Sequence, residues 1–167
     1  MSNLKYLAGY PQQIIEQVEP LIKQDKLGVW LLKRYPTAHT IQSEKALYQY
    51  VTEIKNRYLK KSAPITKICF DSKIQVINHA LGTHSYVSRR QGNKIKTKNE
   101  IRIATIFKKL PEPLLEMIVV HELAHIKEKQ HDKAFYSLCQ HMQPQYHQLE
   151  LDTRLFLTYL ENHADLY

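Results

Sequence analysis

The sequence has little cysteine, glycine and proline, and this scarcity excludes several classes of protein. Its 167 residues include two cysteines, four glycines and seven prolines, too few for a disulfide framework, a collagen or a low-complexity repeat. No apolar run approaches the roughly 18 residues of a membrane-spanning helix, and the first residues lack the apolar core of a secretory signal. We therefore expect a cytoplasmic protein that does not associate with membranes.

The composition is that of a globular protein with excess positive charge. Hydrophobic residues make up 43% and charged residues 24%, which is enough to fill a core and argues against disorder. The formal net charge of +8 favours anionic partners such as nucleotides, phosphates or nucleic acid. The densest basic stretch runs from Arg89 to Lys109, where solvated strand faces are as good an explanation as a phosphate-binding patch. The sequence predicts no particular oligomeric state.

Apolar residues recur at helical spacing in the two outer parts of the chain. In the N-terminal part, about 1–62, we expect a helical segment over 11–33 that is kinked or divided at Pro20, and a helix over about 43–60. In the C-terminal part, about 111–163, we expect three helices. They span about 112–129, 131–142 and 145–161.

The middle part, about 63–107, alternates apolar and polar residues as half-buried strands do. We expect a small antiparallel sheet of four or five strands, with turns at Asp71-Ser72 and Gly92-Asn93. Its expected strands are 65–70, 73–77, 84–90, 93–97 and 99–106. The three parts together predict one α+β domain over residues 1–167.

His121-Glu122-Leu123-Ala124-His125 is an HExxH motif on one of the expected helices. Residues four apart on a helix share one face, with Cβ atoms about 5–6 Å apart, so both imidazoles can bind one metal ion. Glu122 can then reach a metal-bound water and accept its proton. The preceding turns are almost wholly apolar, so the helix is expected to be buried. The alternative is a helix whose polar side chains have other protein partners.

A catalytic zinc site usually has three protein ligands and a water. His131 lies six residues after His125, which leaves room for the chain to turn back. In HExxHxxGxxH sites a glycine makes this turn, but Glu128 has that place here, so the turn must form differently. Glu128 is also the rival third ligand, and His131 could instead be a surface histidine that caps the next helix. Zinc is the expected ion, with another divalent metal as the alternative.

The segment His121–Tyr136, HELAHIKEKQHDKAFY, resembles the YgjP-like metallopeptidases of bacteria, which are related to the SprT/Spartan-like zinc proteases. The similarity covers essentially the whole chain. Outside this segment it is carried by Gly9–Pro11, Glu100–Ala104, Gln143–Glu150 and Asp152–Leu155. The resemblance implies a zincin-like single domain of N-terminal helices, a small antiparallel sheet, an HExxH active-site helix and C-terminal helices. It also implies that His121, His125 and His131 bind zinc and that Glu122 is the base.

The expected function is zinc-dependent hydrolysis by a metal-activated water, with a peptide as the first substrate. The resemblance also implies an alternative, the pyrophosphatase reaction on a nucleoside triphosphate, UTP above all. A third interpretation is a nucleic-acid-binding protein with a structural metal, although such a site has no use for a base. Five residues are candidate contacts to the substrate or the transition state, with ordinary packing as the alternative for each. They are Arg102, Tyr136, Tyr146, His147 and Arg154.

Overall fold

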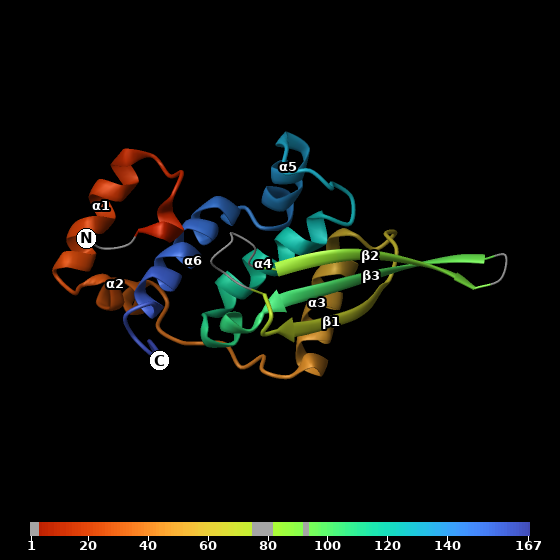
Figure 1. The fold of residues 1–167 in the computed structure, drawn as a ribbon, viewed down its shortest axis with the longest axis horizontal. Helices are drawn as coiled ribbons and strands as arrows, with labels where there is room; N and C mark the ends of the chain where they lie inside the picture. The colour runs from red at the N-terminus through yellow and green to blue at the C-terminus, as the bar shows by residue number, and fades with distance from the viewer. Residues whose placement is uncertain (1–3, 75–81, 92–93) are drawn as a thin grey trace.

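In the part of the chain that the structure describes, there are six α-helices and a three-stranded sheet, which confirms the α+β fold class. α3 and α4 contact the sheet, and α1, α2 and α6 lie to one side of it (Figure 1). The computed structural model describes residues 4–74, 82–91 and 94–167, with side chains at 4–74 and 99–167. The elements in chain order are η1 (Lys5–Leu7), α1 (Gln12–Lys23), α2 (Leu27–Arg34), α3 (Glu44–Tyr58), β1 (Ile65–Asp71), β2 (Gly82–Gln91), β3 (Lys94–Ala104), η3 (Thr105–Lys109), α4 (Glu112–Ala124), α5 (Lys133–Met142) and α6 (Tyr146–Leu160).

The helices of the N-terminal part begin close to the expected positions. Ser43 caps α3, because its hydroxyl accepts a hydrogen bond from the N–H of Ala46 at 3.1 Å. The division of the first helical segment lies beyond Pro20, since α1 continues through that residue and the chain turns at Asp25. The φ of Asp25 is 53°, in the left-handed region that aspartate tolerates better than most residues.

The sheet is mixed, so the expectation of a wholly antiparallel sheet is wrong. The strand order is β1-β3-β2, and β3 runs parallel to β1 and antiparallel to β2. β1 and β2 run in opposite directions, but these two strands are not neighbours. Because β3 fills the place between them and reverses once more, it runs parallel to β1.

The structure corrects two further expectations for the sheet. The stretches 93–97 and 99–106 belong largely to one continuous strand, β3, which ends at Ala104 where η3 begins. Lys73 lies in a turn and not at the start of a strand. The remainder of the expected strand 73–77 from residue 75 on, and the Gly92-Asn93 turn, lie outside the described residues.

α4 lies at the centre of the fold and contacts α3, α5, α6, β2 and β3. Its apolar side chains are therefore covered on every face. The helix ends at Ala124, before the expected end at Lys129. Residues 127–130 are charged or polar and would add no apolar face to the core. Instead, the N–H of Ile126 bonds to the carbonyl of Leu123 at 3.1 Å, and the chain leaves the helix in a tight turn.

A buried polar network fixes α6 against α2. The carboxylate of Asp152 is fully buried. It accepts hydrogen bonds from Arg34 Nε at 2.8 Å, from the amide of Gln148 at 2.8 Å and from the hydroxyl of Tyr35. A buried carboxylate is stable only with such partners. The network therefore holds the position of α6, whose first residue is Tyr146.

The outer half of β2 and β3 projects from the body of the protein as a two-stranded ribbon (Figure 1). The basic residues between 89 and 98 belong to this ribbon, and their side chains lie outside the described part of the structure. A phosphate or nucleic-acid contact there therefore stays a prediction. No helix in the described residues is long and apolar enough to cross a membrane.

Candidate metal centre and active site

Three histidines bring their ring nitrogens together where α4 ends. Nε2 of His131 lies 3.3 Å from Nε2 of His121 and 3.0 Å from Nε2 of His125. Nitrogens that bind one tetrahedral ion at about 2.0–2.1 Å are roughly 3.3–3.4 Å apart. The spacing of the three rings therefore fits a single metal ion, and within the described side chains these residues form a group able to hold one.

The other ring nitrogens of the two motif histidines are also engaged. Nδ1 of His121 lies 2.7 Å from the hydroxyl of Tyr146, and Nδ1 of His125 lies 3.0 Å from the carbonyl oxygen of Glu128. When Nε2 binds a metal, the neutral ring carries its proton on Nδ1 and donates it to such an oxygen. Tyr146 and the Glu128 carbonyl thus hold both rings with Nε2 toward the cluster.

The turn after α4 explains how His131 reaches the other two rings without the glycine of HExxHxxGxxH sites. The chain leaves the helix at His125, and the Glu128 carbonyl is held by the ring of that histidine. Glu128 therefore holds His125 through its backbone oxygen. The third member of the metal-binding group is His131 and not the side chain of Glu128. The cap of α5 is Asp132, which accepts a hydrogen bond from the N–H of Phe135 at 3.0 Å. His131 therefore does not cap that helix.

Phe135 forms the floor of the cluster. Its ring centroid lies 4.9 Å from that of His121, 4.6 Å from His125 and 4.9 Å from His131, and the side chain is fully buried. An apolar floor restricts how the rings rotate and keeps water away from their lower side. Sequence reasoning did not assign Phe135 to the site. The available signal was its position four residues after His131, on the first turn of a capped helix.

Glu122 lies inside the protein next to the cluster. It is 2% exposed, its Oε2 has no hydrogen-bond partner among the described residues, and burial raises the pKa of its carboxyl group to about 8. A buried carboxyl group without a partner is costly. A metal ion with a bound water would provide a partner, so the orphaned oxygen and the three-nitrogen donor set both fit a hydrolytic metal site.

Burial also keeps the motif histidines neutral. It lowers the pKa of His121 to about 3, with smaller contributions from His125 and His131. Burial likewise lowers the pKa of His125, although the hydrogen bond to the Glu128 carbonyl raises it. Only a neutral imidazole can bind a metal. Burial therefore favours the metal-binding form of these two rings.

Three of the other candidate residues lie beside the cluster. Tyr146 is buried beneath it, with its ring 6.3 Å from that of His121. The partly exposed Tyr136 lies 6.4 Å from the His131 ring, and the exposed His147 lies 5.4 Å from Tyr136. The structure therefore brings these three residues to the metal-binding group, and a substrate contact by any of them stays a prediction.

The two arginine candidates are held in ion pairs. Arg154 donates to Glu150 and to the carbonyl of Tyr6 at 3.1 Å. Arg102 pairs with Asp71 at 3.1 Å and with Glu100 at 3.7 Å. A phosphate would therefore have to compete with these carboxylates.

The strand that carries Arg102, β3, has a strand on each side, because it pairs with both β1 and β2. It therefore offers no free edge to a peptide. In the described sheet, β2 is the edge strand that contacts α4. A peptide that extends the sheet beside the active-site helix would therefore pair with β2.

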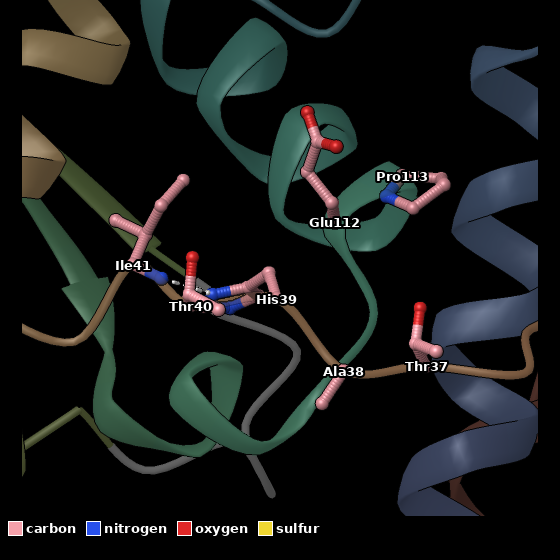
Figure 2. A pocket seen from close by; sticks show the side chains of 7 residues that line it. All are labelled: Thr37, Ala38, His39, Thr40, Ile41, Glu112 and Pro113. Carbon is pink, nitrogen blue, oxygen red and sulfur yellow. Dashed lines mark hydrogen bonds between the residues drawn. The ribbon is translucent and has the colours of Figure 1, made fainter.

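A separate cavity of about 300 Å³ lies at the other end of α4 (Figure 2). It is lined by Thr37, Ala38, His39, Thr40, Ile41, Glu112 and Pro113. Both nitrogens of His39 already have partners there, the N–H of Ile41 at 3.0 Å and the carbonyl of Phe107 at 2.6 Å. At about 1.5 Å per residue, Glu112 is roughly 13 Å along the helix from His121, so this cavity is not part of the metal-binding group.

Comparisons with known proteins agree with this geometry. The family model described as "YgjP-like, metallopeptidase domain" matches residues 34–154. A protein of Escherichia coli (strain K12) named UTP pyrophosphatase is 59% identical over 160 residues, which are 96% of each chain. No solved structure matches the chain. Peptidases and pyrophosphatases both split a bond with water, which supports the hydrolase class. The family match covers more than half of the chain, and the chain therefore belongs to the YgjP-like family.

Proposed function

We propose that this hydrolase is a zinc-dependent nucleoside triphosphate pyrophosphatase that acts on UTP. The observation that carries the proposal is the 59% identity, over 96% of both chains, to a protein named UTP pyrophosphatase. The geometry supports it, because three converging imidazole nitrogens and one buried carboxyl group are the parts that a metal-activated water requires.

Three residues would hold the ion, and a fourth would handle the proton. His121, His125 and His131 supply three nitrogen donors, a set that suits zinc far better than magnesium or calcium. Bound there, zinc would lower the pKa of a bound water and polarise a phosphoryl oxygen. Glu122 would accept one proton of the attacking water while the water oxygen bonds to the α-phosphorus. The bond from that phosphorus to the oxygen bridging it to the β-phosphate would break, and pyrophosphate would leave. A carboxyl group with a pKa near neutrality is well suited to take up and release that proton.

Peptide hydrolysis, the first expectation from the sequence, is the second candidate. The family model is described as a metallopeptidase domain, and the edge strand β2 contacts the active-site helix. A peptide could add to that edge through backbone hydrogen bonds. Nucleic-acid binding around a structural metal is the least favoured candidate, because Glu122 leaves a buried carboxylate oxygen without a partner next to the cluster. A cytoplasmic location stays a prediction.

A direct screen distinguishes the candidates. The purified protein is loaded with one equivalent of zinc and incubated in parallel with UTP, the other nucleoside triphosphates and an unfolded protein. We expect release of pyrophosphate and UMP from UTP, and loss of this activity when the metal is removed by a chelator. Metal-dependent cleavage of the unfolded protein without release of pyrophosphate would contradict the proposal and favour the peptidase.

A further inference from the structure

We propose that Tyr136 is the base-binding platform of this site, on which the base of a nucleoside triphosphate stacks while the phosphates lie at the three histidines. The inference rests on the proposed function and adds to it the residue that holds the nucleoside. Base–aromatic stacking needs a ring with an accessible face at a fixed position relative to the reacting phosphate.

Among the described tyrosines and phenylalanines next to the cluster, Tyr136 is the one that solvent can reach. Phe135 is fully buried and Tyr146 is 2% exposed, so neither offers a face to a ligand. Tyr136 is partly exposed and lies beside His131, whereas the exposed His147 packs beside Tyr136 and Tyr146. His131 is also exposed, but its Nε2 is directed toward the other two ring nitrogens. Of the described side chains that pack around the cluster, Tyr136 therefore offers the most suitable ring for stacking.

The position of Tyr136 matches the dimensions of a nucleotide. Its ring centroid lies 6.4 Å from that of His131, with 32° between the ring planes. One ribose separates the base of a nucleotide from its α-phosphate, so a base on Tyr136 places that phosphate near the histidine nitrogens. Tyr136 is kept near the cluster because it follows Phe135 in α5, and the buried ring of Phe135 packs against all three histidines.

The chemistry of the ring suits an anionic ligand. Burial and the nearby carboxylate of Glu150 raise the pKa of Tyr136, so the phenol stays neutral and does not repel the phosphates. Stacking itself tolerates any base. Preference for one base must come from polar groups at its edge, and His147, 5.4 Å from Tyr136, is placed to provide a ring nitrogen there.

The test distinguishes binding of the base from binding of the phosphates. For the zinc-loaded Tyr136→Leu variant we expect a KM for UTP about 5- to 100-fold above that of the unchanged protein, the usual effect of losing one stacked base. Tyr136→Phe keeps the ring and should change KM by less than about threefold. Inhibition by ribose 5-triphosphate, which lacks the base, should be the same in all three proteins. Tyr48→Leu is the matched control, because this tyrosine of α3 is 44% exposed, and the change should leave KM unchanged.

A second measurement needs no variant and therefore does not depend on how Tyr136→Leu folds. The unchanged protein should bind UTP about 5- to 100-fold more tightly than ribose 5-triphosphate. Equal binding of the two, or an unchanged KM for UTP in Tyr136→Leu, overturns the platform and leaves the pyrophosphatase proposal intact. If the zinc-loaded protein hydrolyses no nucleoside triphosphate, the proposed function fails and the platform fails with it.

Discussion

Replacement of Tyr146 by phenylalanine tests how the metal site is held. The change removes the hydroxyl that lies 2.7 Å from Nδ1 of His121 and keeps the ring that packs beneath the cluster. Tyr146 is 2% exposed, so water cannot easily replace the lost oxygen. A buried N–H without an acceptor costs about 1–3 kcal/mol, and loss of such a supporting contact typically weakens metal binding by about 10- to 100-fold.

The assay is competition for zinc between the protein and a chromophoric chelator, with the cobalt-substituted protein as a spectroscopic check. We expect zinc affinity to fall by about 10- to 100-fold in Tyr146→Phe and the visible cobalt spectrum to change, because the His121 ring is no longer fixed. Tyr136→Phe loses a hydroxyl beside the same cluster and should keep both properties. Unchanged zinc affinity in Tyr146→Phe would refute the reasoning.

Three further predictions concern Glu122, Asp152 and Arg102. Burial raises the pKa of Glu122 from 4.5 to about 8, so the folded metal-free protein keeps a proton that the unfolded chain loses. This stabilisation is complete below about pH 4 and is lost as the pH rises toward 8. In urea denaturation, the free energy of unfolding of the metal-free protein should therefore fall relative to that of Glu122→Gln between pH 5 and 8. The opposite trend would contradict the burial of this group. Asp152→Ala should lower the free energy of unfolding by about 2–4 kcal/mol, whereas Glu161→Ala, which removes a more exposed ion pair, should cost less than about 1 kcal/mol; equal losses would refute the role of the buried network. Arg102→Ala should raise the KM for UTP roughly fivefold and change peptide cleavage little; equal effects on both would indicate a structural role.

Helices could be predicted from the sequence because their signals are local. Apolar spacing and the Ser43 cap place α3 within two residues of its observed ends. The end of α4 was placed too late, because no glycine or proline marks it. It depends on a polar segment with nothing to pack against and on the hydrogen bond between His125 and the Glu128 carbonyl. Tertiary contacts of this kind have no local sequence pattern.

The sheet illustrates a second limit. Alternation identifies strands, but it does not say which strand lies next to which. The strand order β1-β3-β2 puts β3 between two strands that precede it in the chain. The parallel pair with β1 follows from that order and not from any residue in β3.

In the candidate site too, some residues can be predicted from the local sequence and others depend on tertiary contacts. His121 and His125 were predictable because residues four apart lie on one face of a helix, and Glu122 follows His121 directly in the motif. The contact of Tyr146 with His121 joins residues 25 positions apart, and sequence reasoning could name Tyr146 as a candidate but not its partner. Phe135 was missed because a buried phenylalanine on an amphipathic helix is usually core.

The central claim is that Glu122 and a metal held by three histidines hydrolyse a nucleoside triphosphate. It is tested most directly by measuring bound zinc and the release of pyrophosphate from UTP in the unchanged protein and in Glu122→Gln. The account predicts one zinc ion in both proteins and a rate about 10²- to 10⁴-fold lower in the variant, the usual contribution of a general base. Equal rates in the two proteins, or loss of zinc together with activity in the variant, would contradict it.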